Sequence, residues 1–510
     1  MSKVTFPNSN DIPGVHNISD IDSASILGQD RKSNFGSRTN LVSFKLEDIQ
    51  LQVENNEVAD VTVNLDYIDG LNPKRLKNVV SIANKIEDYL TNYPNDPNDF
   101  FEVINRNLTE ELLNDSKLKL SKVLDSLSVN LDVSPKIIPF PFDNTNTRTS
   151  DGDLNDIVSF ELKDIQLDVT NKENADVTIT LDYINGVDPS DFKEVGMIAD
   201  RVEEYLTNYP NNPNDFFEVI NRNLTEELLS DPNLGLSEVL DSLSVNLDVA
   251  PAIIPFQFDN TTTRTPNGDI NDVVSFQLED VTSPIDGGIV TDITVNLDYV
   301  DGIDSSAFKE IGLISNYIED FLANYPVEAG FYEVLNRDLT QGLLNDSNIG
   351  LSGVLDSLSV NLDVEPKIIP FQFDTTITRT TNGDTNEIVS FQLEDISLPI
   401  DGASVADVAV NLDYIDGIDP SAFKDVIPLG NFIEDYLTNY SNSKDSFEVV
   451  NNNLGKALLT DANLELSEVL DSLTVTLDAS PGVIPFQFEN TVTLTPNETT
   501  IFGGSEFTTV

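Results

Sequence analysis

Apolar and polar residues alternate in short stretches of this chain, and the same stretches return four times. In the first copy, residues 61–67 and 127–133 place apolar side chains at every second position, which is typical of strands with one buried face. Between them, apolar residues recur at helical spacing over residues 76–90 and again over 101–112. Further strands flank this core at both ends, so each copy predicts the order strand, strand, helix, helix, strand, strand.

The two outer strands of the copy carry irregular signals. Over residues 43–53 the apolar positions are even up to Leu46 and odd from Ile49, which predicts a β-bulge near Glu47 and Asp48. The last strand covers residues 137–149, and its prolines favour an irregular start. Asn72 followed by Pro73 predicts the N-terminal cap of the first helix.

The four copies define the organisation of the chain. Leu65-Asp66-Tyr67 returns at Leu181, Leu297 and Leu412, so the copies are spaced by 116, 116 and 115 residues. A unit of about 115 residues has the size of a domain. We divide the chain into an N-terminal polar extension (1–41), four repeats (42–157, 158–273, 274–388 and 389–495) and a C-terminal tail (496–510).

Successive repeats are joined by very short connections. Residues 150–156 lead directly from the last strand of one copy into the first strand of the next, which predicts a hairpin. The fold class is therefore α+β: four tandem ββααββ units in one continuous antiparallel sheet, with helices on its apolar face. This strand order resembles the tunnelling fold of urate oxidase and pterin-making enzymes, although no specific motif of those families is present. The resemblance implies a barrel with helices outside; sixteen strands could close one, and an open curved sheet or four looser domains are the alternatives.

Composition narrows the function classes. The chain has 28 basic and 88 acidic residues, a formal charge of −60, which disfavours nucleic acid and favours cations or basic partners. It has no cysteine and one histidine, His16, so zinc-thiolate and histidine-based chemistry have no repeated ligands. We expect no cleaved secretory signal and no membrane insertion, since no apolar run approaches the roughly 18 residues of a span. The hydroxyl-rich tail resembles the C-terminal signals of type I secretion substrates.

The loops between repeats are the candidate metal sites. Each places oxygen-bearing side chains around a glycine, the ligand type that calcium prefers, but no complete EF-hand pattern follows. A polar hairpin turn explains the same residues equally well. The candidate ligands are Asp151, Asp153, Asn155 and Asp156, then Asn267, Asp269, Asn271 and Asp272, and finally Asn382, Asp384, Asn386 and Glu387.

Carboxylates and arginines also recur at fixed positions. Two sets of aspartates fall on the polar faces of the second and third strands, where a closed barrel would arrange them around a lumen as a cation-binding surface. We expect the repeated arginines to pair with carboxylates between or within units, and their loss in the last copy fits a repeat that has no successor. The aspartates are Asp66, Asp182, Asp298 and Asp413, with Asp132, Asp248, Asp363 and Asp478; the arginines are Arg106, Arg222 and Arg337, with Arg148, Arg264 and Arg379.

From these features we expect a non-enzymatic, acidic repeat protein with a structural, adhesive or cation-dependent binding role at a bacterial surface or outside the cell. Calcium is the expected cofactor. Two alternatives remain at this point: an intracellular acidic scaffold that binds basic partners, and a binder or enzyme for purine- or pterin-like ligands at the junctions between repeats.

Overall fold

A computed structural model gives the fold of most of the chain. It describes residues 35–51, 57–94, 96, 99–134, 140–169, 173–250, 256–283, 289–326, 331–364, 371–400, 404–480 and 488–496. The expected N-terminal extension up to residue 34, His16 and the tail from residue 497 lie outside these residues.

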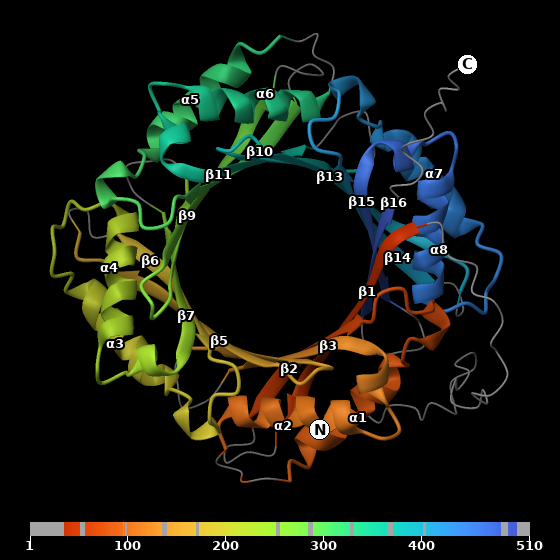
Figure 1. Ribbon diagram of the computed structural model, residues 1–510, viewed down its shortest axis with the longest axis horizontal. Helices are drawn as coiled ribbons and strands as arrows, with labels where there is room; N and C mark the ends of the chain where they lie inside the picture. The colour runs from red at the N-terminus through yellow and green to blue at the C-terminus, as the bar shows by residue number, and fades with distance from the viewer. Residues whose placement is uncertain are drawn as a thin grey trace, which may run out of the picture.

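Sixteen antiparallel strands form one closed barrel (Figure 1). Each strand pairs with its neighbours in the chain, and β1 pairs with β16 to close the ring. The strands are β1 (Phe35–Gln50), β2 (Val58–Tyr67), β3 (Leu124–Val133), β4 (Phe142–Thr149), β5 (Leu154–Gln166), β6 (Asn174–Tyr183), β7 (Leu240–Val249), β8 (Phe258–Arg264), β9 (Ile270–Ser283), β10 (Ile289–Tyr299), β11 (Leu355–Val364), β12 (Phe373–Thr380), β13 (Thr385–Leu398), β14 (Ser404–Tyr414), β15 (Leu470–Ser480) and β16 (Phe488–Pro496).

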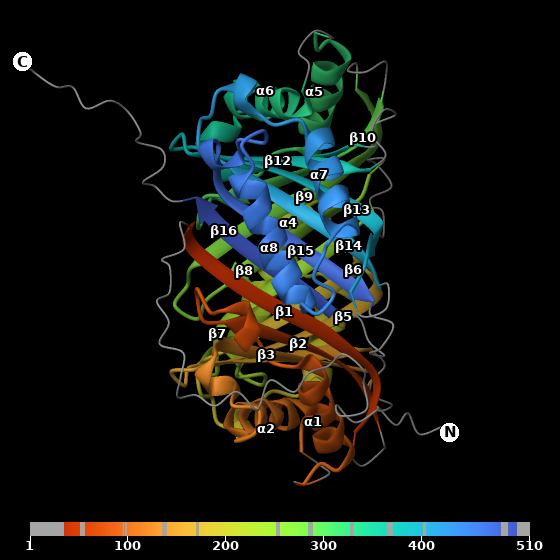
Figure 2. The same ribbon diagram turned by 90° about the vertical axis from the view of Figure 1, so that its right-hand side faces the viewer.

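In the described part of the chain, eight α-helices cover the outside of the barrel in four pairs (Figures 1 and 2). They are α1 (Val79–Thr91), α2 (Phe101–Asn114), α3 (Val195–Thr207), α4 (Phe217–Ser230), α5 (Ile311–Ala323), α6 (Tyr332–Asn345), α7 (Val426–Thr438) and α8 (Phe447–Thr460). The predicted α+β class, the ββααββ order and the closed form of the sheet are therefore confirmed, and the open sheet is not adopted. A barrel of this kind leaves no free sheet edge.

The hydrophobic core lies between the barrel wall and the helices. Along β2, Val61, Val63, Leu65 and Tyr67 are fully buried, whereas the residues between them are only partly buried. Because strand side chains alternate, the buried set points outward under the helices and the polar set points into the barrel. The hydroxyl group of Tyr67 accepts a hydrogen bond from the backbone N–H of Lys77, as its equivalents do in the other repeats. These tyrosines are part of the core.

Two local predictions were tested by the strand and helix boundaries. The bulge in β1 is confirmed: the register shifts between Leu46 and Ile49, and Asp48 has a φ of 56°. The predicted start of the first helix is wrong. Pro73–Arg75 form a separate short 3₁₀-helix capped by Asn72, and α1 begins only at Val79, because the side chain of Asn78 caps it by accepting from the N–H of Val80.

Candidate binding surface inside the barrel

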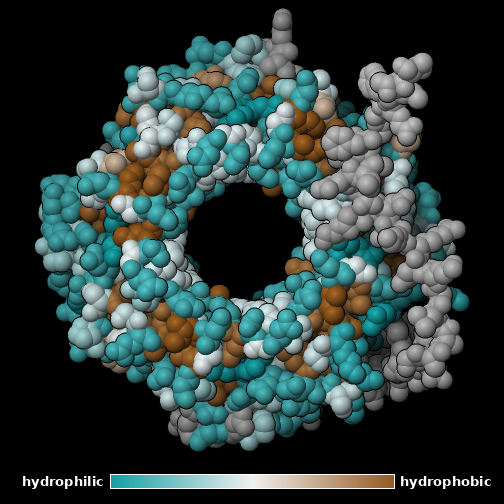
Figure 3. Space-filling model, viewed as in Figure 1, coloured by the Kyte–Doolittle hydropathy of each residue, from teal (hydrophilic) through white to brown (hydrophobic). Residues whose placement is uncertain are grey.

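The inner wall of the barrel is a polar surface whose composition repeats from one ββααββ unit to the next. Figure 3 shows an open passage through the ring, bordered largely by hydrophilic residues. Sixteen strands are enough to leave an aqueous interior that side chains do not fill. In β3, for example, Ser126, Ser128, Asn130 and Asp132 face this interior. Both sets of aspartates singled out from the sequence lie on this inner wall.

In every repeat, three carboxylates line up side by side across three strands of this wall. Asp60 of β2 is paired with Asp132 of β3, which is paired with Asp143 of β4; Ser159 of β5 follows. Side chains directly opposite each other on antiparallel strands are about 4.5–5.5 Å apart at Cβ. The equivalent rows are Asp176, Asp248 and Asp259; Asp292, Asp363 and Asp374; and Asp407, Asp478 and Glu489. We call these the carboxylate rows.

The first carboxylate of each row has a structural task. The Oδ1 atom of Asp60 accepts a hydrogen bond of 3.0 Å from the backbone N–H of Asp48, the residue with positive φ in the bulge of β1. Asp176, Asp292 and Asp407 do the same for the bulges of the later repeats. Asp60 also pairs with Lys45 at 2.9 Å. The two following carboxylates of the row also face the lumen, and in the second and third repeats the amides of Gln257 and Gln372 donate to the middle one, Asp248 and Asp363.

The third carboxylate is held in place by an amide. Asn130 donates from Nδ2 to Oδ1 of Asp143 at 2.9 Å and to the hydroxyl of Thr145 at 2.8 Å. Partial burial raises the pKa of Asp143, and the nearby charge of Asp132 raises it further. The hydrogen bond from Asn130 opposes this rise, and a cation bound between Asp132 and Asp143 would oppose it further by favouring the charged carboxylates.

A shallow hollow of about 350 Å³ adjoins this row on the inner wall. Its lining includes Asn130, Asp132, Asp143, Ser159 and Glu161. These five side chains offer oxygen atoms or an amide, and Pro141, Phe142 and Phe160 add apolar atoms to the lining, so only the polar side of the hollow suits the ammonium or hydroxyl groups of a ligand. Lys163, the neighbouring cation, is already paired with Glu161 at 3.1 Å.

The candidate calcium loops are hairpin turns between repeats. Gly152 adopts a φ of 99°, and the N–H of Asp153 donates to the hydroxyl of Thr149, so the loop is held by its own backbone and that hydroxyl. Asp151 and Asp153 are exposed at the tip, as are Asp269 and Asp384 in the later loops.

The side chains after the tip diverge to opposite faces of the sheet. Asn155 donates to Oδ1 of Asp182 on the inner wall, and Asn271 and Asn386 do the same with Asp298 and Asp413. Asp156 instead is buried on the outer side, as are Asp272 and Glu387. The structure therefore does not gather the ligands of one loop around one point. Within the described residues, no group of three or more acidic or histidine side chains is arranged to hold a metal ion.

The buried loop carboxylates form ion pairs that join the second helix of one ββααββ unit to the first strand of the next. Arg106 of α2 pairs with Asp156 of β5, donates from Nη1 to the carbonyl oxygen of Val187 at 2.7 Å and lies 4.8 Å above the ring of Phe192. The same contacts recur for Arg222 with Asp272, Ile303 and Phe308, and for Arg337 with Glu387, Ile418 and Phe423. The expected arginine–carboxylate pairing is found here. Arg148 and Arg264 pair within their own repeats, with Glu110 and Glu226, whereas Arg379 contacts the hydroxyl of Thr385.

Sequence reasoning missed a buried glutamate at the start of the second helix of each repeat. Glu102 is 4% exposed, and burial raises its pKa to about 7, with a smaller contribution from Asp156. The equivalent residues are Glu218, Glu333 and Glu448. The signal was available, since an acidic residue recurs in all four copies directly after the phenylalanine or tyrosine that begins this helix.

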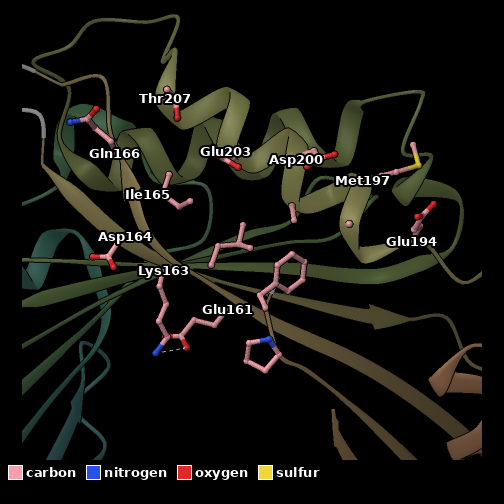
Figure 4. A pocket seen from close by; sticks show the side chains of 15 residues that line it. Glu161, Lys163, Asp164, Ile165, Gln166, Glu194, Met197, Asp200, Glu203 and Thr207 are labelled. Carbon is pink, nitrogen blue, oxygen red and sulfur yellow. Dashed lines mark ion pairs between the residues drawn. The ribbon is translucent and has the colours of Figure 1, made fainter. Parts of the chain in front are cut away.

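A groove on the outside lies where the first repeat meets the second (Figure 4). It has a volume of about 860 Å³ and lies between α3 and the end of β5. Phe140, Leu162 and Ile165 provide apolar contacts, while Asp200 and Glu203 come from the helix. The Phe140 ring stacks on that of Phe160 with 5.3 Å between the centroids.

Comparisons with protein-family models, curated proteins and solved structures found no match. The closed barrel with outer helices agrees with the tunnelling fold only at the level of architecture. None of the helices in the described parts of the chain is both long and apolar enough to cross a membrane.

Proposed function

We propose that this protein is a non-enzymatic acidic ring that binds cations and positively charged chains inside its barrel. The observation that carries the proposal is the carboxylate row, repeated four times around a closed polar lumen. Carboxylates in a concave, partly dehydrated surface create a stronger negative potential than the same charges on a convex surface. A chain with ammonium groups can contact several rows at once, which gives avidity without a specific pocket.

The test compares charge removal inside and outside the ring. The probe is a fluorescein-labelled deca-lysine peptide, and binding is measured by fluorescence anisotropy at physiological salt. The inner variant combines D132N, D248N, D363N and D478N, and the outer control combines D88N, E204Q, D320N and D435N on the exposed faces of the helices. Both remove four negative charges. We expect the inner variant to weaken binding at least about tenfold and the outer control to change it by less than about threefold; equal losses would contradict binding in the lumen.

We propose a location outside the cell or at the cell surface. The acidic, cysteine-free composition supports this location. Fractionation of the producing cells tests it, because recovery in the cytoplasm would favour an intracellular scaffold for basic partners instead.

The outer groove supports a second candidate function, the binding of a small planar ligand at a junction between repeats. Phe140, an aromatic ring that lines the groove and stacks on the buried ring of Phe160, is the observation that favours it. Thermal shift with xanthine is the test. A stabilisation that is lost in F140L would support this candidate, and no stabilisation would exclude xanthine as its ligand.

A further inference from the structure

The four junctions between repeats are not equivalent. Three of them join consecutive repeats, and there the chain itself crosses as a hairpin, from β4 to β5, β8 to β9 and β12 to β13. The fourth, which we call the closing junction, is the pairing of β1 with β16 and brings the first and last repeats together. It is the one strand pairing of the barrel whose members are not neighbours in the chain.

The closing junction also lacks the buried ion pair of the other three. Asn452 of α8 stands where the others have arginine, and Asn40 of β1 stands where they have Asp156, Asp272 or Glu387. Both asparagines are almost fully buried. Among the described residues, the Nδ2 atoms of both, and Oδ1 of Asn40, have no hydrogen-bond partner. A buried amide without partners loses its hydration and gains nothing in return.

Arg38, which lies on β1 across the closing junction from α8, makes one of the contacts that arginine makes at the other junctions. Arg38 of β1 donates to the carbonyl oxygen of Leu71, which is equivalent to the carbonyl of Val187 that Arg106 contacts. Its Nε has no partner, and among the described residues no carboxylate pairs with it. Leu76 replaces the phenylalanine ring on which the other arginines lie.

The charges around Arg38 add repulsion instead of attraction. Lys456 of α8 stands where the first two repeats have Glu110 and Glu226. Burial lowers the pKa of Lys456, and the positive charge of Arg38 lowers it further. The two cations therefore repel each other at the closing junction, whereas the residues equivalent to Lys456 in the first two repeats form ion pairs with Arg148 and Arg264.

We infer that the ring opens at the closing junction, by separation of β1 from β16, well before any other strand pair separates. The covalent hairpins and buried ion pairs hold the other three junctions, and here both are missing. If the lumen binds charged chains as proposed above, this opening admits a long chain from the side without threading its end. The opening itself does not depend on that proposed function.

Hydrogen exchange of the full-length protein, followed by mass spectrometry without any ligand, tests the inference. We expect the backbone amides that pair β1 with β16 to exchange at least about tenfold faster than those that pair β4 with β5. Equal protection at the two junctions would overturn the inference. Failure of deca-lysine binding would not affect it, since no ligand is present.

Two sets of substitutions test whether the residues at the closing junction cause the opening. The combination R38L, N40D, L76F and N452R gives the closing junction the residues of the first one, and it should slow exchange of β1 and β16 about tenfold or more. K456E, a single change that offers Arg38 a carboxylate, should slow it in the same direction. A control, R106N with D156N, should leave the exchange of β1 and β16 unchanged. Unaltered exchange of β1 and β16 in a folded K456E protein and in the combined variant would contradict the role of these residues.

Discussion

Arg106 and Asp156, fifty residues apart in the chain, form a buried ion pair that joins α2 to β5, the first strand of the next ββααββ unit. Arg106 also reaches the carbonyl of Val187 and the ring of Phe192 in the second repeat. One side chain thus connects α2 with three segments of its neighbour. The equivalent arginines repeat this arrangement at two further junctions, so it holds the ring together as a pattern.

The first prediction is that replacing Arg106 alone lowers the free energy of unfolding more than replacing Arg106 and Asp156 together. R106N leaves the carboxylate of Asp156 buried with only Asn146 as a partner, which should lower the free energy of unfolding by about 3–5 kcal/mol. R106N combined with D156N should recover part of this loss, because it removes the uncompensated buried charge, but it should stay below the wild type, since the asparagines at the equivalent positions of the closing junction leave buried amides unpaired. Urea unfolding measures both variants. A double variant no more stable than R106N would show that the uncompensated carboxylate is not the cause.

The buried glutamates predict a pH dependence. The pKa of Glu102, Glu218 and Glu333 is raised from 4.5 to about 7 by burial. The folded state therefore holds these protons more tightly than the unfolded state, and stability falls as the pH rises from about 4.5 to above 7. Replacing the three with glutamine should stabilise the protein at pH 8, by about 1–3 kcal/mol per site, and change little at pH 4.

Unfolding free energies at the two pH values, for the wild type and the triple glutamine variant, provide the measurement. The difference between the two proteins is the informative quantity, because the overall charge of −60 affects both alike. An equal effect at pH 4 and pH 8 would mean that ionisation of these side chains does not cost stability.

Two glycines in equivalent helices predict opposite effects of alanine. A Cβ atom on Gly312 of α5 would meet no atom within 4 Å, so G312A should gain up to about 1 kcal/mol from helix propensity. A Cβ atom on Gly430 of α7 would lie 2.8 Å from the ring of Phe371, so G430A should lose about 1–3 kcal/mol. Thermal unfolding of the two variants distinguishes the helices. Stabilisation by both would show that Phe371 does not pack against α7 in this way.

Calcium should raise the unfolding temperature if divalent cations bind the carboxylates. We expect millimolar calcium to raise the midpoint by several degrees more than sodium chloride at equal ionic strength, and a chelator to reverse the effect. The variant D151N/D153N separates the exposed loop from the lumen. It should retain the effect if the carboxylate rows bind the ion and lose part of it if the loop does. An unfolding midpoint that calcium does not change at low ionic strength would contradict calcium binding.

Much of the fold followed from periodicity, whereas the closure of the ring did not. The alternation in β2 and β3 fixed which face is buried, and the short connection between Thr149 and Leu154 required neighbouring repeats to share the sheet. Closure depends on the twist and tilt accumulated over sixteen strands, which no local pattern encodes. The sequence does contain one indication of closure, because asparagines replace both partners of the ion pair, at Asn452 and at Asn40. This indication can be interpreted only when the last repeat is known to meet the first.

The candidate site was predictable in part. The positions of Asp66 and Asp132 on the polar face followed from strand alternation, and their place on a lumen followed once the barrel was closed. The loop residues were harder, because a hairpin turns Asn155 and Asp156 to opposite faces of the sheet. Of the residues spaced like a metal-binding loop, Asn155 therefore lies on the inner wall and Asp156 lies in the ion pair with Arg106.

Intramolecular disulfide formation across the closing junction tests the ring most directly. Leu41 and Thr491 are paired in register on the inner wall, within reach of a disulfide, and the natural chain contains no cysteine. We expect L41C/T491C to oxidise completely within one chain at low protein concentration, giving a monomer with no free thiol. The control L41C/T261C, with its second cysteine on β8, should remain reduced. Free thiols or disulfide-linked dimers in L41C/T491C would contradict a ring closed by a single chain.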